Sequence, residues 1–188
     1  PFLIYGRSIG SLCAIHVAHA FRDSSRFLGT IIEAGMADIR ALPLLAPVVG
    51  LAGGLPDILH LEEKLSATVK PMLVIHGTED EVIPIAQGRA IVAAAGAAES
   101  DKFLCECTGK GHNSVLRGLR GGLGPALKLF LDCTLGGQAL GAAFAEGSSN
   151  LLAEGAAAPL RGVAAAEASF LAKNYEDAKA AYTAILAG

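Results

Sequence analysis

A serine stands between two glycines near the start of the chain, in Gly6-Arg-Ser8-Ile-Gly10. This Gly-x-Ser-x-Gly pattern follows the apolar run Phe2–Tyr5 and leads into an apolar stretch from Ile9 to Phe21. A serine hydroxyl is a weak nucleophile, so folds that use one present it on a sharp turn between a strand and a helix, where a base can reach it. We therefore predict that Ser8 is a catalytic nucleophile. The alternative is an ordinary strand-to-helix turn.

The two glycines of this motif predict a close crossing of helix on strand. A side chain at Gly6 or Gly10 would crowd the turn or the crossing, whereas glycine tolerates a strained backbone and a close approach. We expect both positions to need glycine.

Acidic residues and a histidine that could activate a serine stand farther along the chain. One segment reads His76-Gly-Thr-Glu-Asp80-Glu81, and another reads Gly109-Lys-Gly-His112-Asn113. A positioned histidine can take the serine proton and return it to the leaving group, which typically contributes about 10² to 10⁴-fold. A carboxylate can orient that imidazole and stabilise its charged form. Glu79, Asp80 and Glu81 are rival candidates for this acid, and a solvated acidic turn is the alternative.

The stretches that must position these residues alternate between strands and helices. Strands are expected at residues 1–5, 27–33, 69–76 and 102–107, and helices at residues 9–21, 85–95 and 114–131. Several prolines and glycines between residues 36 and 68 predict short helices and loops, which would form either a lid over an apolar substrate or a plain buried connection.

This alternation predicts an α/β fold with a parallel sheet that is covered on both faces. Ligands of such sheets bind at the carboxyl ends of the strands. Ser8, Asp80 and His112 each follow a predicted strand. The three side chains are therefore expected at one rim of the sheet.

Together these motifs resemble the α/β-hydrolase superfamily. The resemblance rests on Gly-Arg-Ser-Ile-Gly-Ser at 6–11, His-Gly-Thr-Glu-Asp-Glu-Val-Ile-Pro at 76–84 and Gly-Lys-Gly-His-Asn at 109–113. The motifs look most like the Bem46-like subgroup, which includes protein depalmitoylases. The resemblance covers roughly residues 1–132 and implies a partial α/β-hydrolase fold, with the last four strands of a mostly parallel sheet of about eight.

The resemblance also implies a role for each residue. The family's chain order of nucleophile, acid and base matches Ser8, Asp80 and His112, because Asp80 takes the last position of His-Gly-x-x-Asp. The backbone N–H of Ile9 would donate to the oxyanion. In the family a second donor comes from a loop after an earlier strand, which this chain lacks. Losing one donor typically costs about 10² to 10³-fold in turnover, so the chain is expected to label poorly with serine-directed probes.

Composition excludes several other classes of protein. Of the 188 residues, 52% are hydrophobic and 18% are charged, and the formal net charge is −3. These values fit a buried globular core and argue against a disordered or nucleic-acid-binding chain. The sequence holds no apolar run long enough to cross a bilayer. No cofactor is predicted.

The cysteines and remaining histidines do not form a recognisable metal site. Cys105 and Cys107 lie two apart on a predicted strand, but zinc would need further ligands nearby. His16 and His19 are three apart on a predicted helix without a third ligand. We predict reduced, structural cysteines, which favour a cytoplasmic location.

The start at Pro1 indicates a fragment, so any membrane attachment would be encoded upstream. The first strand would then be an exposed, aggregation-prone edge of the sheet.

The sequence predicts three segments. Residues 1–133 form the truncated hydrolase domain, residues 134–160 are a Gly/Ala-rich linker, and residues 161–188 form a helical hairpin. That hairpin resembles a tetratricopeptide repeat, although Lys173 stands where a glycine is usual. A repeat would imply docking of a protein partner, and a simple helical hairpin is the alternative.

The hypothesis that combines these observations is a serine hydrolase that cleaves an ester or thioester through an acyl-enzyme. Palmitoyl-protein is the most specific substrate that the resemblance implies. Two alternatives stay open, namely a serine peptidase-like α/β-hydrolase and a non-catalytic protein-binding scaffold built from the truncated domain and the repeat.

Overall fold

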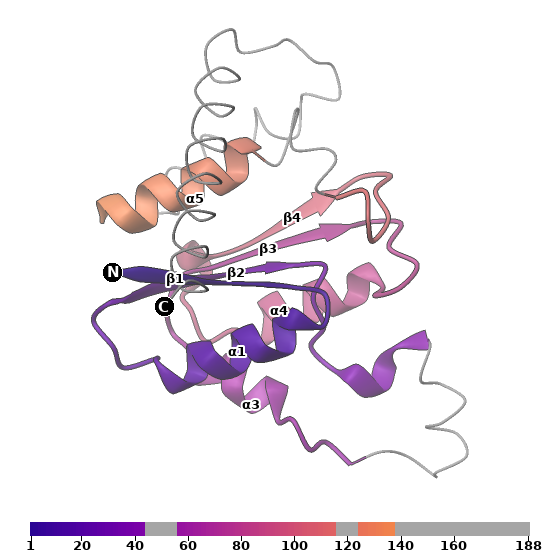
Figure 1. The fold of residues 1–188 in the computed structure, drawn as a ribbon, viewed down its shortest axis with the longest axis horizontal. Coiled ribbons are helices and arrows are strands. Elements are labelled where there is room, and N and C mark those ends of the chain that lie inside the picture. The colour runs from indigo at the N-terminus through magenta and orange to yellow at the C-terminus, as the bar shows by residue number, and fades with distance from the viewer. Residues whose placement is uncertain (44–55, 116–123, 138–188) are drawn as a thin grey trace, which may run out of the picture. The chain divides into compact units, whose positions relative to one another are not determined.

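The centre of the computed structural model is an open parallel sheet (Figure 1). The structure describes residues 1–43, 56–115 and 124–137. Within them the strands run in the order β1 (Phe2–Arg7), β2 (Phe27–Glu33), β3 (Met72–Gly77) and β4 (Lys102–Cys107), and every neighbouring pair is parallel. The prediction of a partial parallel α/β sheet is confirmed.

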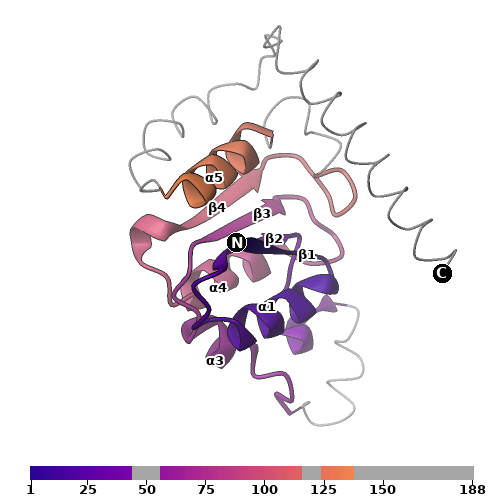
Figure 2. The same ribbon diagram turned by 60° about the vertical axis from the view of Figure 1, so that its left-hand side comes forward.

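Helices cover both faces of this sheet (Figures 1 and 2). Helices α1 (Gly10–Ala20), α3 (Leu61–Ser66) and α4 (Ile85–Ala94) lie on one face, and α5 (Gly124–Gly136) lies on the other. Two short 3-10 helices, Ile39–Ala41 and Glu99–Asp101, complete the described elements.

The apolar runs of the central strands explain this layering. Successive side chains of a strand point to opposite faces, so a strand that is covered on both sides is apolar throughout. On β2, Ile31 packs in a cluster with Phe130 of α5, whereas its neighbour Ile32 packs with Ile15 of α1. Each such buried side chain stabilises the fold by about 1.5–3 kcal/mol. The sheet is therefore packed between two apolar layers.

One predicted helix differs from the structure at its start. The sequence predicted a helix over residues 114–131, and α5 (Gly124–Gly136) confirms its later part, but residues 114–115 belong to a turn. The Ser114 hydroxyl accepts a hydrogen bond from the Gly111 N–H at 2.8 Å and donates one to the Gly111 carbonyl at 3.1 Å. A serine side chain that bonds the backbone in this way competes with helix formation.

Several predictions about the end of the chain lie outside the described residues. Helix α5 continues to Gly136, past residue 133, where the sequence placed the end of the domain. The rest of the predicted linker and the repeat-like hairpin at residues 161–188 are not described. The protein partner and the cytoplasmic location stay predictions. Among the described residues, no helix combines the length and apolar character needed to span a membrane.

Candidate active site

Ser8 lies on a strained turn between β1 and α1. Its φ angle is +53°, in the left-handed region that residues with a side chain rarely occupy. The Ser8 N–H donates a hydrogen bond of 2.9 Å to the carbonyl of Glu33, at the end of the neighbouring strand. Strain of this kind persists only where surrounding contacts hold it, and it is found most often at functional sites. The turn projects the Ser8 side chain at the carboxyl end of the sheet.

The two glycines of the motif differ in what surrounds them. A Cβ added at Gly6 would lie 2.4 Å from the Ala14 Cβ and 2.7 Å from the Gly10 carbonyl oxygen. A Cβ added at Gly10 would have no atom of the described residues within 4 Å. The expectation of a close crossing is therefore confirmed for Gly6 and is wrong for Gly10, because α1 leaves the strand with its first residue facing open space.

We expect Gly6→Ala to destabilise the protein and Gly10→Ala to be tolerated. The clash at Gly6 involves another Cβ and a backbone oxygen, neither of which can rotate away, so the cost should be at least the 1–3 kcal/mol typical of overpacking. At Gly10 the methyl group adds helix propensity worth up to about 1 kcal/mol. Urea unfolding of the two variants measures both effects. Equal stabilities for the two variants would contradict this assignment of the close contact.

His112 links Ser8 to Asp80. Its Nε2 lies 2.9 Å from the Ser8 Oγ, and its Nδ1 lies 2.8 Å from the Asp80 Oδ2. The carboxylate can only accept, so Nδ1 carries a hydrogen and Nε2 is left to accept the serine O–H. Asp80 and His112 are each 6% exposed. Three side chains that are far apart in the sequence thus form one continuous chain of hydrogen bonds.

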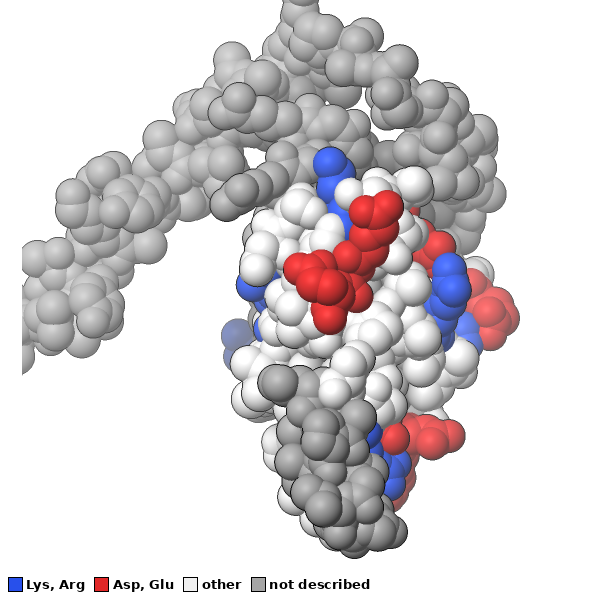
Figure 3. Space-filling model, turned by 90° about the vertical axis from the view of Figure 1, so that its right-hand side faces the viewer, with Lys and Arg blue, Asp and Glu red and all other residues white. Residues whose placement is uncertain are grey.

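The turn after β3 selects Asp80 among the three acidic residues. Its Oδ1 accepts hydrogen bonds from the N–H groups of Val82 at 3.0 Å and Ile83 at 2.7 Å, which leaves Oδ2 directed at His112. Glu79 and Glu81 are exposed. Figure 3 shows this end of the molecule, with acidic side chains gathered near the centre of the visible face.

His76 supports the same turn from inside the protein. Its side chain is fully buried, and its Nε2 lies 2.7 Å from the Ile83 carbonyl oxygen and 3.5 Å from the Asp80 Oδ2. A carbonyl can only accept, so Nε2 carries the hydrogen. His76 therefore braces the segment whose backbone holds Asp80.

Ile9 carries the backbone N–H that the sequence predicts as an oxyanion donor. It precedes the first residue of α1, and its φ and ψ of −57° and −29° are already helical. The first N–H groups of a helix have no intrahelical acceptor and lie at the positive end of the helix dipole. The Ile9 N–H is thus suited to bind an anionic oxygen that forms next to Ser8.

Part of this chain is similar in sequence to known proteins. No family model matches the chain. A search of curated proteins finds alpha/beta hydrolase domain-containing protein 17B of Homo sapiens, 30% identical over 113 residues, which are 60% of this chain and 36% of that protein. Protein 17C of Mus musculus is 29% identical over 113 residues, with 60% of this chain and 32% of that protein covered. The chain therefore spans about a third of the length of these relatives.

Solved structures show the same fold. Est1E from Butyrivibrio proteoclasticus aligns with a TM-score of 0.50 and 18% identity, over 70% of this chain and 60% of that one. A structure titled for LipS and LipT, two metagenome-derived lipolytic enzymes, aligns with a TM-score of 0.51 and 21% identity, over 68% of this chain and 64% of that one. The chain has the fold of the α/β-hydrolase superfamily.

Two residues of the candidate site, Arg7 and Glu33, were not predicted from the sequence. Arg7 precedes the nucleophile, and its guanidinium bonds both the buried Glu33 carboxylate and the backbone carbonyl of His112. One feature of the sequence could have revealed this pair, namely that Glu33 ends a mostly apolar predicted strand. A buried carboxylate needs a positive partner, so that position could have been matched with a nearby arginine.

The structure describes the cysteine pair on β4 and the two histidines on α1. The Cys107 thiol lies 3.7 Å from the Cys105 carbonyl oxygen. A hydrogen bond between the two side chains lowers the pKa of the Cys105 thiol and, together with burial, raises the pKa of the Cys107 thiol. Within residues 1–43, 56–115 and 124–137, no group of three or more potential metal ligands comes together. The His16 side chain is exposed on α1.

Proposed function

We propose that this protein is a serine hydrolase that cleaves an ester or thioester through a covalent acyl-enzyme on Ser8. The observation that carries the proposal is the hydrogen-bonded series from Ser8 through His112 to Asp80, with distances of 2.9 Å and 2.8 Å. Such an arrangement activates a hydroxyl that would otherwise be a poor nucleophile. The α/β-hydrolase fold and the relatives' names support hydrolysis as the class of reaction.

Acylation would begin when the Ser8 Oγ attacks the substrate carbonyl carbon. His112 Nε2 takes the hydroxyl proton as the new C–O bond forms, and Asp80 stabilises the resulting imidazolium. The Ile9 N–H donates to the oxyanion of the tetrahedral intermediate. When that intermediate collapses, the bond to the leaving alcohol or thiol breaks, and the leaving group takes the proton from His112.

Deacylation would repeat these steps with water as the nucleophile. His112 takes a proton from the attacking water, and the acyl-oxygen bond to Ser8 breaks. The proton then returns to the Ser8 Oγ, and a carboxylic acid leaves. Free enzyme is regenerated, so the cycle consumes only the substrate and one water.

Apolar side chains beside the site favour a hydrophobic acyl group. Ile9, next to the nucleophile, is 69% exposed, and Val82, two residues after the acid, is 44% exposed. An acyl chain laid over them would remove apolar surface from water, at about 25 cal/mol per Å². A palmitoyl-protein substrate is the most specific form of this proposal, and it rests on the motif resemblance together with these exposed side chains.

Pre-steady-state hydrolysis of p-nitrophenyl esters with acetyl, octanoyl and palmitoyl groups tests the proposal. We expect a burst of nitrophenolate that is stoichiometric with enzyme, a matching acyl mass on the peptide containing Ser8, and faster acylation by the longer chains. The matching acyl thioesters show whether the site also accepts a thiol leaving group. The assay should use both this chain and the longest form of the protein that contains it. Turnover without any acylated protein would exclude the acyl-enzyme, and a folded protein without turnover would favour the scaffold.

A further inference from the structure

Arg7 joins the strand that presents Ser8 to the loop that presents His112. Its Nε donates to the Glu33 Oε1 at 3.0 Å, and its Nη2 donates to the His112 carbonyl at 2.9 Å and to the Asn113 Oδ1 at 3.1 Å. One guanidinium therefore bonds the neighbouring strand and the backbone of the candidate base at the same time.

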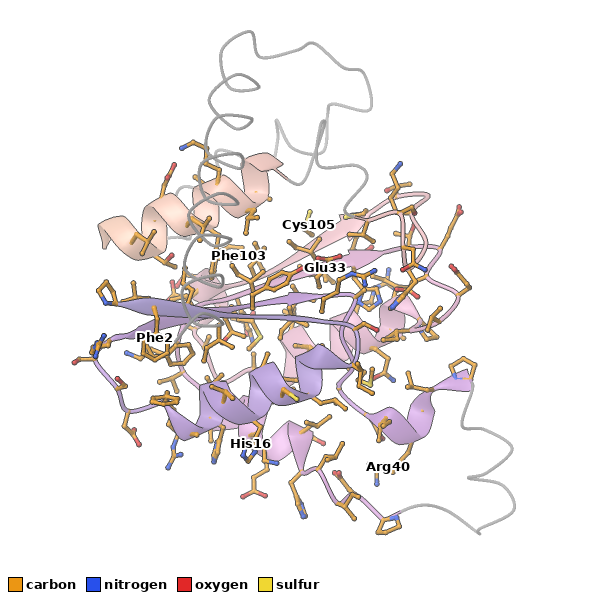
Figure 4. All side chains as sticks on the ribbon, viewed as in Figure 1. Phe2, His16, Glu33, Arg40, Phe103 and Cys105 are labelled. Carbon is orange, nitrogen blue, oxygen red and sulfur yellow. The ribbon has the colours of Figure 1, made fainter. Side chains whose placement is uncertain are left out.

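Glu33 fixes the direction of this guanidinium. Its side chain is 1% exposed, and Figure 4 shows it on the same side of the sheet as Phe103 and Cys105. The Tyr5 hydroxyl donates to the other carboxylate oxygen, Oε2. Burial and this hydrogen bond to Glu33 raise the pKa of the Tyr5 hydroxyl, so it stays a donor. A buried carboxylate held by two donors on β1 has little freedom to move, and Arg7 is held with it.

Arg7 is one of several contacts that hold the loop carrying His112, since the Gly109 N–H also donates to the Thr78 Oγ1 at 3.0 Å and the Lys110 carbonyl accepts from the Glu79 N–H at 3.0 Å. This loop contains Gly109, with a φ of +69°, and Gly111, and glycines give a backbone more conformational freedom than other residues. The side chain of His112 must nevertheless stay within hydrogen-bonding reach of Ser8 on one side and Asp80 on the other. A misplacement of about 1 Å in such an arrangement can cost about 10²-fold in rate.

We propose that Arg7, held in place by Glu33, is a positioning residue that sets the distance between Ser8 and His112. Because Arg7 is the residue before Ser8 in the chain, any movement of the strand carries the nucleophile and the anchor of the base together. The expected effect on rate rests on the proposed function. The hydrogen bonds of Arg7 are observed independently of it.

Arg7→Lys tests the inference with the least disturbance of charge. Lysine keeps a cation facing the buried Glu33, but a single ammonium lacks the planar fork that spans Glu33 and the His112 carbonyl. We expect kcat for ester hydrolysis to fall about 10- to 100-fold, with KM within about twofold of wild type, since a mispositioned base slows the chemical step and leaves substrate binding intact.

Arg89→Lys is the matched control. Arg89 also pairs with a glutamate, through two bonds of 2.8 Å and 3.0 Å to Glu106, but this pair is exposed, and these bonds involve neither Ser8 nor His112. We expect kcat and KM to stay at wild-type values. Thermal unfolding of both variants separates a loss of rate from a loss of fold. If Arg7→Lys does not fold, the double variant Arg7→Met/Glu33→Leu removes both charges and takes its place.

A readout that needs no turnover completes the test. The proton shared by His112 Nδ1 and Asp80 should give a downfield NMR signal in wild type and Arg89→Lys, and a shifted or broadened signal in folded Arg7→Lys. Unchanged kcat together with an unchanged signal in Arg7→Lys would overturn the inference. So would a fall in kcat that is fully explained by the fraction of Arg7→Lys that is unfolded. A wild-type protein that shows the signal but no hydrolysis would refute the proposed function alone, and the signal in Arg7→Lys would still decide the role of Arg7.

Discussion

Replacing Ser8 by alanine is expected to lower kcat for ester hydrolysis by at least about 10⁴-fold. The substitution removes the oxygen that would form the acyl bond, so whatever turnover remains would come from water attacking a bound substrate directly. The fold should persist, because alanine is smaller than serine and the Ser8 N–H keeps its hydrogen bond to the Glu33 carbonyl. Steady-state hydrolysis at saturating substrate measures the effect.

Two further variants make this result specific. Ser25→Ala removes an exposed hydroxyl elsewhere in the chain and should leave kcat unchanged. The double variant Ser8→Ala/His112→Ala should be no slower than Ser8→Ala, because residues that act as a unit are strongly non-additive. Full activity of Ser8→Ala, or independent losses in the double variant, would show that Ser8 and His112 do not act together.

Asp80→Asn should lower kcat by about 10⁴-fold while keeping the shape of the site. The amide oxygen can still accept the N–H groups of Val82 and Ile83, which turns the amide NH₂ toward His112. An NH₂ group donates, so the imidazole would have to accept at Nδ1 and carry its hydrogen on Nε2. An Nε2 that already carries a hydrogen cannot take the Ser8 proton, so the nucleophile loses its base.

Glu79→Gln and Glu81→Gln are the controls for this change. Both side chains are exposed, so each removes one negative charge beside Asp80 without touching the hydrogen bonds of His112. We expect both variants to keep kcat within about twofold, because exposed charges are screened by water and salt. If Glu79→Gln or Glu81→Gln were as damaging as Asp80→Asn, the selection of Asp80 as the acid would be wrong.

The strands could be predicted because their sequence and their burial agree. Residues 27–33 and 102–107 form strands with the predicted bounds, and the helix predicted at residues 85–95 is found as Ile85–Ala94. Parallel strands place their carboxyl ends together, so three residues that each follow a strand were bound to lie near one another. That rule predicts that Ser8, Asp80 and His112 lie near one another. Their hydrogen bonds depend on the local turns, which only the structure describes.

Other features depend on contacts that a sequence does not reveal. The pairing of Arg7 with Glu33 and the His112 carbonyl arises because β1 and β2 are in register at these two residues and the His112 loop folds over them. Gly10 looked equivalent to Gly6, but only the direction in which α1 leaves the turn decides which of the two is crowded. Residues 114–115 belong to a turn instead of the predicted helix because the Ser114 side chain bonds the backbone, and the pattern of apolar residues does not reveal such a bond.

Labelling with a fluorophosphonate probe, followed by peptide mapping, tests the central claim most directly. Such a probe bonds to a serine only where a neighbouring base has activated the hydroxyl. In the longest form of the protein that contains this chain, we expect a single adduct on Ser8, strongly reduced in Asp80→Asn and absent in Ser8→Ala, while Ser25→Ala labels like wild type; this chain alone is expected to label more weakly. Labelling at another serine, or labelling of Asp80→Asn at the wild-type rate, would contradict the account.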